Sequence, residues 1–439
     1  MTGDGRDRGN DDGNADPIPT ASRETASETD AGGPATTPTT ATDGGDTSEA
    51  TRRGIRPGIG RGSAGDTGVG TGEDGPADAD VAAVLSDVEA DLVEEYRAGV
   101  RRKLAFVGGT LVVLVAVAVY ALATGPIAIT PGELVRVLVA EGDPVHERVV
   151  WNIRLPRIVA AIGAGVALAA AGAVVQSVLR NPLASPYTLG ISQAAAFGAA
   201  VAIVVLGAGT RQDSGTVVLL DNPYLTSVTA FLASLLSTGA ILAIARLKRA
   251  TPETLVLAGV ALGSLFTAGT AVLEYFATNT QLATLVFWKF GDVGAATWRL
   301  NAVLWAVALA AGVYFTRRAW DYNVLDAGDD TARGLGVNVS RVRLTAMIAA
   351  ALATAVTVSM FGVIGFVGLV VPHVVRRAIG GDERLLVPAS CVAGGTLLLA
   401  ADTIARTLLS PVVLPVGIVT AFVGVPLFVY LIVHGRDYW

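Results

Sequence analysis

A succession of long apolar runs occupies this chain from residue 104 to residue 434. About 20 consecutive apolar residues in a helix cross the hydrocarbon layer of a bilayer, which is ~30 Å thick. Because many such runs follow one another with short polar connections, we predict an all-α, multi-pass membrane protein with about ten transmembrane helices. The predicted spans are residues 104–123, 156–176, 186–208, 225–246, 254–277, 299–317, 341–362, 364–379, 387–408 and 414–433.

The charge of the chain is divided between two unlike parts. Residues 1–95 carry 21 Asp and Glu against 7 Lys and Arg, whereas residues 96–439 carry 17 against 25. The first 80 residues hold no aromatic residue and lack the basic start and apolar core of a signal peptide. Such a segment buries too little apolar surface to offset its ordering entropy. We predict a disordered acidic tail over 1–80, a short cytoplasmic helix or linker over 81–103 and a polytopic transmembrane domain over 104–439.

The basic residues of the membrane part indicate its orientation. Lys and Arg accumulate in the cytoplasmic loops of membrane proteins. Clusters such as Arg101–Arg102–Lys103 before the first span and Arg376–Arg377 at the end of the eighth fall on one side when the number of spans is ten. We therefore predict a multi-pass protein of the cell membrane with both termini in the cytoplasm.

The connection after the sixth predicted span, residues 323–343, is unusually long and polar. It reads as two short helical pieces, with a turn at Gly334 and Gly336 before the next span. Its length and polarity suit a docking surface for a soluble partner. An ordinary solvated loop has the same composition, so composition alone leaves both interpretations open.

A few polar or helix-breaking residues fall inside the apolar stretches. Pro372 removes a helix hydrogen bond, so we predict a kink or break there. The neighbouring His373 has no second histidine or acid at ligand spacing and is expected to be an ordinary polar residue. Glu274 lies near the outer end of a span, and Asp402 and Arg406 stand at i and i+4, close enough to pair. Ionisable groups in spans are usually paired or functional.

Several classes of function lack their motifs. The single cysteine, Cys391, excludes an intrachain disulfide and a cysteine-based metal site. No GxxxxGK[ST] loop is present, so nucleotide-driven transport would need ATP hydrolysis in a separate subunit. No catalytic pair supports an intramembrane enzyme, and no cofactor, metal or nucleic-acid partner is expected. An ion-gradient-driven secondary transporter would want charged residues in mid-membrane, which the spans mostly lack.

Six blocks together resemble the permease subunits of binding-protein-dependent ABC importers for vitamin B12 and ferric siderophores, the BtuC/FecCD family. The resemblance covers residues 104–434, and several long motifs occur in the family's order and spacing. The blocks are WNIRLPRIVAAIGAGVALAAAGAVVQSVLRNPLASPYTLGIS (151–192), LAGVALGSLF (257–266), FWKFGDVGAATW (287–298), GFVGLVVPHVVRRAIGGDERLLVPAS (365–390), ADTIAR (401–406) and LPVGIVTAFVGVPLFVYLI (414–432). The long acidic tail departs from the family.

The resemblance implies a homodimer of ten-helix subunits, two ABC ATPase subunits on the cytoplasmic side and an extracellular substrate-binding protein. The loop 325–337 matches the family's coupling helices, which raises docking above the ordinary-loop interpretation. The residues carried over for ATPase coupling are Leu325, Asp326, Gly328, Asp329, Ala332, Arg333, Leu335 and Gly336. Those for binding-protein docking are Arg154, Arg157 and Arg406, and those for the cytoplasmic gate are Asn181, Leu183, Thr251 and Pro252.

The mechanism implied by the resemblance is alternating access, in which ATP-driven closure of the ATPase pair shifts the helices through the coupling loop. Cobalamin and an iron–siderophore chelate are the expected substrates, and the chain does not separate them. A haem importer permease of the same family and an ion-gradient-driven secondary transporter are the alternatives.

Overall fold

A computed structural model describes residues 76–125, 127, 129–139, 141–208, 210–213, 217–220, 222–247 and 251–434. The predicted disordered tail lies outside these residues, except for 76–80, where the first helix begins. All described residues belong to one compact unit, Asp74–Trp439.

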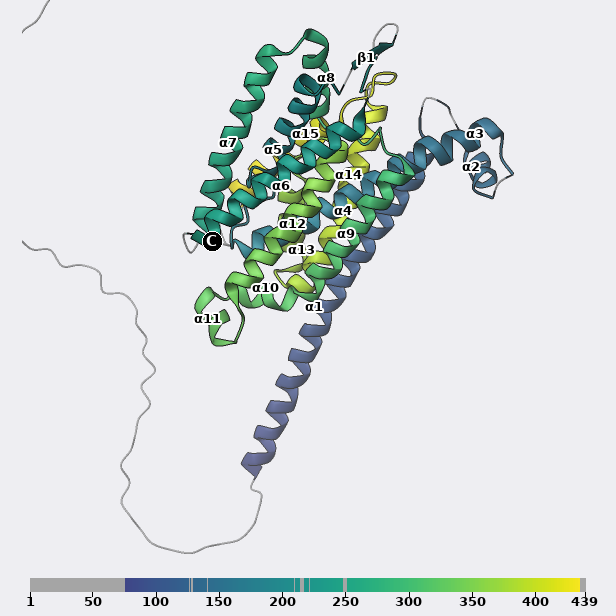
Figure 1. Cartoon of the computed structure of the whole chain (residues 1–439). Helices are drawn as coiled ribbons and strands as arrows, with labels where there is room; N and C mark the ends of the chain where they lie inside the picture. Colours follow the sequence, from purple (N-terminus) through teal and green to yellow (C-terminus); the bar gives the residue numbers. More distant parts are fainter. Residues whose placement is uncertain are drawn as a thin grey trace, which may run out of the picture. The chain divides into compact units, whose positions relative to one another are not determined.

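The described chain is built almost entirely of helices, as Figure 1 shows. A short antiparallel hairpin pairs β1 (Thr210–Asp213) with β2 (Val217–Leu220), with Thr210 opposite Leu220. The helices are α1 (Pro76–Ala123), α2 (Pro131–Leu138), α3 (Pro144–Val149), η1 (Val150–Arg154), α4 (Leu155–Val178), α5 (Ile191–Ala200), η2 (Val201–Val205), α6 (Pro223–Leu247), α7 (Pro252–Phe276), α8 (Asn279–Lys289), α9 (Trp298–Arg317), α10 (Ala319–Asp326), α11 (Asp329–Gly334), α12 (Val339–Phe361), α13 (Val367–Ile379), α14 (Glu383–Thr407) and α15 (Val416–His434).

Each of the ten predicted apolar segments contains a helix, which confirms the all-α membrane fold. Seven helices are long and apolar enough to cross a membrane: Arg97–Ala123, Pro144–Val178, Pro223–Arg246, Pro252–Phe276, Trp298–Arg317, Val339–Phe361 and Glu383–Thr407. The other three predicted segments form the shorter helices α5 with η2, α13 and α15. The linker helix expected over 81–103 is continuous with the first span, because both belong to α1.

Two connections between the predicted spans also contain helices. The amphipathic segment after the first span forms α2, where Thr130 and Glu133 make a reciprocal capping box. The segment 279–297, too short to span, begins with α8, whose capping box is made by Thr278 and Gln281. Each box satisfies backbone N–H groups that the first turn of a helix leaves unpaired.

The central helix of the bundle is α4, which packs against α9, α12, α13 and α14. It is rich in alanine and glycine. In the most apolar stretch of the span Pro144–Val178, to which it belongs, 83% of the residues are buried. A Cβ on Gly165 would lie 2.2 Å from the carbonyl oxygen of Gly394 on α14, and one on Gly172 would lie 1.8 Å from that of Gly368 on α13. Small residues therefore let three helices meet backbone to backbone, the usual means of close packing in lipid.

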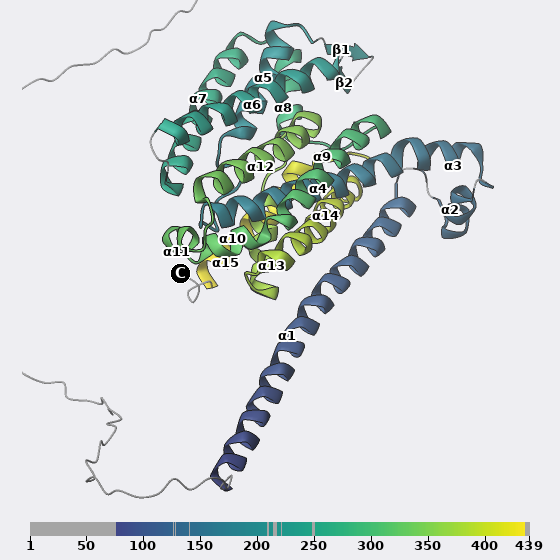
Figure 2. The same cartoon turned by 60° about the horizontal axis from the view of Figure 1, so that its bottom comes forward.

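A second group of helices, α5 to α8, packs beside this centre (Figure 2). The link between the groups is α12, which contacts α4, α5, α6 and α9. By contrast, only 6% of the residues in the most apolar stretch of α1 are buried, so most side chains of that stretch face outward. An apolar helix with this exposure suits a lipid-facing position.

The chain breaks its helical course between α12 and α13, at residues 362–366. Gly362 (φ 74°) and Phe366 (φ 66°) both have left-handed backbone conformations. A Cβ on Gly362 would lie 2.2 Å from the carbonyl oxygen of Trp288, so only glycine fits there. Of the kink or break predicted at Pro372, the break is wrong, because α13 runs through Pro372 and the interruption comes before the helix. The position of the break is decided by local packing at Gly362, which cannot be predicted from the apolar pattern of the sequence.

Candidate functional site

A cavity of about 720 Å³ lies where three of the shorter helices begin. The loop before α5 and Ser192 in its first turn form one part of the wall. The interruption before α13 and the first residues of α15 form other parts. Irregular backbone at membrane depth is tolerated where it is buried in protein or lines a cavity. The short helices and the cavity therefore belong to one structural feature.

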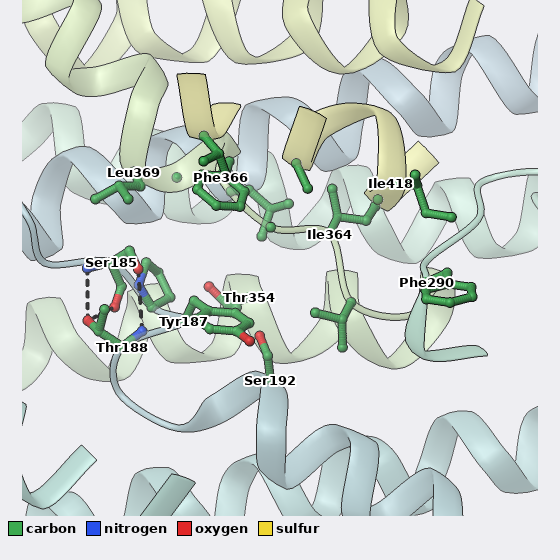
Figure 3. Close-up of a pocket in the computed structure, with 18 of the residues that line it drawn as sticks. Ser185, Tyr187, Thr188, Ser192, Phe290, Thr354, Ile364, Phe366, Leu369 and Ile418 are labelled. Carbon is green, nitrogen blue, oxygen red and sulfur yellow. Dashed lines mark hydrogen bonds between the residues drawn. The ribbon is translucent and has the colours of Figure 1, made fainter. Parts of the chain in front are cut away.

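The lining of this cavity is mostly apolar. Figure 3 shows Ile364, Phe366, Leu369 and Ile418 on one side and Ser185, Tyr187, Thr188 and Ser192 on the other. Ser185 and Thr188 satisfy each other: the backbone N–H of each donates to the hydroxyl of the other, at 3.1 and 3.3 Å. The polar atoms of this loop are thus largely engaged within the protein, which leaves few groups to hold a ligand tightly.

Among the described residues, Lys289 at the end of α8 is the one basic or acidic side chain that lines this cavity. Its Nζ lies 2.9 Å from Oε1 of Glu274 on α7, so the charge is neutralised within the protein. A smaller cavity of about 270 Å³ is lined by both residues and shares Tyr187, Ser192 and Val363 with the larger one. Glu274, singled out in the sequence as an ionisable residue in a span, is therefore paired beside the cavity.

The four predicted gate residues do not line the larger cavity. The Asn181 side chain accepts a hydrogen bond from the backbone N–H of Leu183 at 2.9 Å, which shapes the loop leading to Ser185. Thr251 caps α7, and Pro252 is the first residue of that helix. Their gate role stays a prediction. The aromatic lining residues Tyr187, Phe290 and Phe366 were not predicted from the sequence, because they come from three distant segments.

The predicted coupling residues form α10, α11 and the turns beside them, as expected for two short helical pieces. Leu325 and Ala332 are fully buried and anchor these helices to the bundle. Leu335 is 66% exposed and points away from the core. The turns contain Gly328 (φ 112°) and Gly336 (φ 80°), whose backbone conformations favour glycine. The predicted set thus divides into an anchored face and an outward face.

Asp329 connects this surface to the spans. Its carboxylate lies 3.1 Å from Arg180, which follows α4, and 3.1 Å from Arg343 on α12. Arg333 approaches the same carboxylate at 3.8 Å. Arg343 also donates from Nε to the carbonyl oxygen of Val178, the last residue of α4. The α10–α11 surface is therefore joined by charged hydrogen bonds to the ends of two central helices.

A second ionic cluster lies at the opposite end of α4. Asp402 on α14 is fully buried and accepts hydrogen bonds from Arg157 at 2.8 and 2.9 Å. Arg406 donates to the same carboxylate at 3.1 Å, which confirms the predicted i, i+4 pair. Arg157 also lies 3.3 Å from Asp292, beyond α8. The partnership of Arg157 and Asp402, 245 residues apart, left no sequence signal.

Arg154 lies in the interior rather than on the rim. It is 4% exposed, and its guanidinium donates to the carbonyl oxygens of Leu122, Ala123 (3.2 Å) and Ile127. Leu122 and Ala123 belong to the last turn of α1, whose carbonyls lack helical partners, and Ile127 lies in the loop after it. In this conformation Arg154 caps α1. The docking role of Arg154, Arg157 and Arg406 stays a prediction, and Arg154 would have to leave these carbonyls to reach a partner.

Two residues with possible chemistry of their own are isolated. His373 has a partly buried ring whose Nδ1 has no hydrogen-bond partner among the residues that the structure describes. Cys391 is a free, partly buried thiol in α14. Within the described part of the chain, no three His, Cys, Asp or Glu side chains gather in a way that suits a metal ion.

Comparison with known proteins agrees with this architecture. The sequence model of the FecCD transport family matches residues 112–434. An ABC transporter permease protein of Methanocaldococcus jannaschii is 48% identical over 342 residues, covering 78% of this chain and 98% of that protein. The hemin transport system permease protein of Yersinia pestis is 38% identical, covering 66% of this chain and 84% of the relative. The vitamin B12 import system permease protein of Vibrio cholerae is 38% identical, covering 67% and 85%.

A solved structure is similar as well. It is a metal-chelate-type ABC transporter in an inward-facing conformation, 28% identical, with a TM-score of 0.65 over 74% of this chain and 98% of that one. The bundle with its interrupted helices, the cavity and the matched family together identify the chain as a member of the FecCD transport family, the multi-pass membrane permeases of ABC transporters.

Proposed function

We propose that this chain is the permease subunit of a binding-protein-dependent importer that moves cobalamin or an iron–siderophore chelate into the cell by alternating access. Energy would come from separate ABC ATPase subunits. The observation that carries this proposal is the link from the α10–α11 surface through Asp329 to Arg180 and Arg343. A force applied to this surface would reach the helices that surround the cavity.

The proposed assembly contains two copies of this permease and two ATPase subunits, with one binding protein on the outer side. Both termini and the α10–α11 surface would face the cytoplasm. The basic residues support this orientation, because Arg101, Arg102 and Lys103 precede the first span and Arg333 lies on the proposed ATPase side. Membrane lipid would cover outward faces such as that of α1.

The lining of the cavity suits a substrate that is held weakly. Its volume of about 720 Å³ lies in the range of small-molecule sites. With an apolar lining and one neutralised charge, it offers few groups for recognition. Specificity would then reside mainly in the binding protein. Relatives named for vitamin B12 and for hemin support either kind of chelate, so a haem importer permease is the alternative within the family.

The proposed docking residues can be tested through Arg406, whose side chain is 11% exposed. Charge pairing across an interface chiefly affects association rate and register, and salt weakens it. Arg406→Gln should slow capture of the binding protein at low salt more than at high salt. Capture that is unchanged at every salt concentration, by a permease that still folds, would remove Arg406 from the docking surface.

Uptake in cells tests the function as a whole. Cells lacking this chain should lose uptake of labelled cyanocobalamin, of a labelled ferric siderophore or of haemin, and the wild-type gene should restore it. Loss of one substrate alone identifies the cargo. If all three uptake rates match those of wild-type cells, and tagged permease retains no ATPase on purification, the proposed function is wrong.

A further inference from the structure

The helix α13 reaches from the cavity to the α10–α11 surface. Gly368 and Leu369, in its first turn, line the cavity together with the preceding Phe366. Arg376 lies in its last turn. The helix has 13 residues and is therefore about 20 Å long. One end of this short helix thus lines the cavity, and the other end carries Arg376.

Arg376 joins this helix to three others. Its Nη2 lies 3.1 Å from Oε1 of Glu383 on α14 and 3.2 Å from Oγ of Ser177 on α4. Its Nη1 lies 4.0 Å from Asp326 on α10, at the limit of an ion pair. Asn323 on α10 adds two bonds of 2.8 Å, accepting from the backbone N–H of Glu383 and donating to Asp382. A shift of α10 would therefore change the contacts of Arg376 and Glu383 directly.

The cluster around Arg376 is incompletely bonded. Glu383 is fully buried, and its Oε2 has no hydrogen-bond partner among the described residues. Nε of Arg376 and the hydroxyl of the buried Tyr322 on α10 also lack partners there. Unsatisfied buried groups are costly and require an explanation. Donors and acceptors left free in one cluster are available for a second arrangement of hydrogen bonds.

The backbone permits α13 to move as a unit. Left-handed residues bound it at both ends, Phe366 (φ 66°) before it and Gly380 (φ 87°) after it. Against α4 it packs through Gly172 and Gly368, with no side chain between the two backbones. Short segments that end in such breaks can shift as rigid bodies, because a few terminal residues absorb the change in φ and ψ.

We propose that α13 is the lever that carries movement of the α10–α11 surface to the cavity wall, with Arg376 and Glu383 as its positioning residues. This inference rests on the proposed function, because it assumes an ATPase that acts on α10 and α11. In one state Arg376 bridges Asp326, Glu383 and Ser177. In the other the weak contact with Asp326 breaks, and α13 shifts its cavity end relative to α4.

A thiol at the cavity end of α13 reports the movement. Leu369→Cys, in a chain whose native thiol is removed by Cys391→Ala, is assembled with its ATPase in lipid nanodiscs. A membrane-impermeant maleimide is the probe, and its labelling rate is measured without nucleotide and after trapping with ATP and vanadate. We expect trapping to change the labelling rate about five- to tenfold. Arg376→Gln should abolish that change. The matched control is Arg377→Gln, at the exposed neighbouring residue, and it should preserve the change.

Asp326→Asn keeps the test decisive if Arg376→Gln folds poorly. Burial raises the pKa of the Asp326 carboxyl, and Arg376 and Arg180 offset only part of this effect. The neutral amide should therefore fold at least as well as the wild type at neutral pH, yet lose the nucleotide response. If both variants fold and respond like the control, α13 is not the lever. If the parent chain itself shows no response, the proposed coupling to an ATPase fails instead.

Discussion

The two ends of α4 carry similar chemistry arranged in different ways. At one end Asp402 is fully buried and satisfied by two arginines. At the other, the Asp329 side chain is 23% exposed, and its partners Arg180 and Arg333 are 38% and 60% exposed. The first cluster is centred on a buried carboxylate between two spans, whereas the second joins spans to a surface element. The comparison indicates that the Asp402 cluster holds its end of α4 in place, whereas the Asp329 cluster can rearrange. We call the first cluster the staple and the second the adjustable link.

The largest effect should follow loss of the buried carboxylate. Asp402→Ala leaves Arg157 and Arg406 without their shared partner, and breaking a buried ion pair in this way costs about 3–5 kcal/mol. We expect a markedly lower melting temperature in detergent. Asp330→Ala is the matched control, because that carboxylate is 99% exposed. Equal melting temperatures for the two variants would refute the staple.

Loss of the cap on α1 should rank next. Arg154→Gln removes charged hydrogen bonds to carbonyls at the end of α1, at a cost of about 1–3 kcal/mol. Hydrogen exchange should rise in the last turn of α1 and the following loop. If exchange there is unchanged while capture of the binding protein is lost, Arg154 acts in docking rather than as a cap.

The adjustable link should show its effect in transport rather than in stability. Asp329→Asn weakens the contacts with Arg180 and Arg343, and we expect roughly tenfold less uptake per ATP hydrolysed. The melting temperature should fall less than for Asp402→Ala. An uptake ratio that stays at the wild-type value would show that Asp329 is only structural.

The smallest effect concerns pH at the start of α14. Burial alone would raise the pKa of the Asp382 carboxyl, but hydrogen bonds from Asn323 and the Arg384 backbone and the charge of Arg384 hold it below its ordinary value of 3.8. A lowered pKa contributes stability above the ordinary value, and this stability is lost as the pH falls through the folded-state value. Asn323→Ala should therefore reduce the melting temperature less at pH 3 than at pH 7. A constant difference would contradict this assignment.

The sequence alone predicted features that depend on local pattern. Apolar length predicted ten segments, each of which contains a helix, and the spacing of Asp402 and Arg406 predicted their contact. Features that depend on packing were not predictable in this way. Arg157 meets Asp402 only because α4 and α14 pack together, and the helix break lies at Gly362 because Trp288 approaches it there. The wall of the cavity combines segments that are distant in the chain.

One measurement tests the contrast between the two ends of α4 most directly. Asp329→Asn and Asp402→Asn are assembled with ATPase and binding protein in proteoliposomes, and uptake of the cargo identified in cells is measured per ATP hydrolysed alongside the melting temperature. We predict that Asp329→Asn lowers the uptake ratio with a small change in melting temperature. Asp402→Asn should lower the melting temperature while the protein that remains folded keeps its uptake ratio. The reverse pattern, or the same pattern for both, would contradict the account.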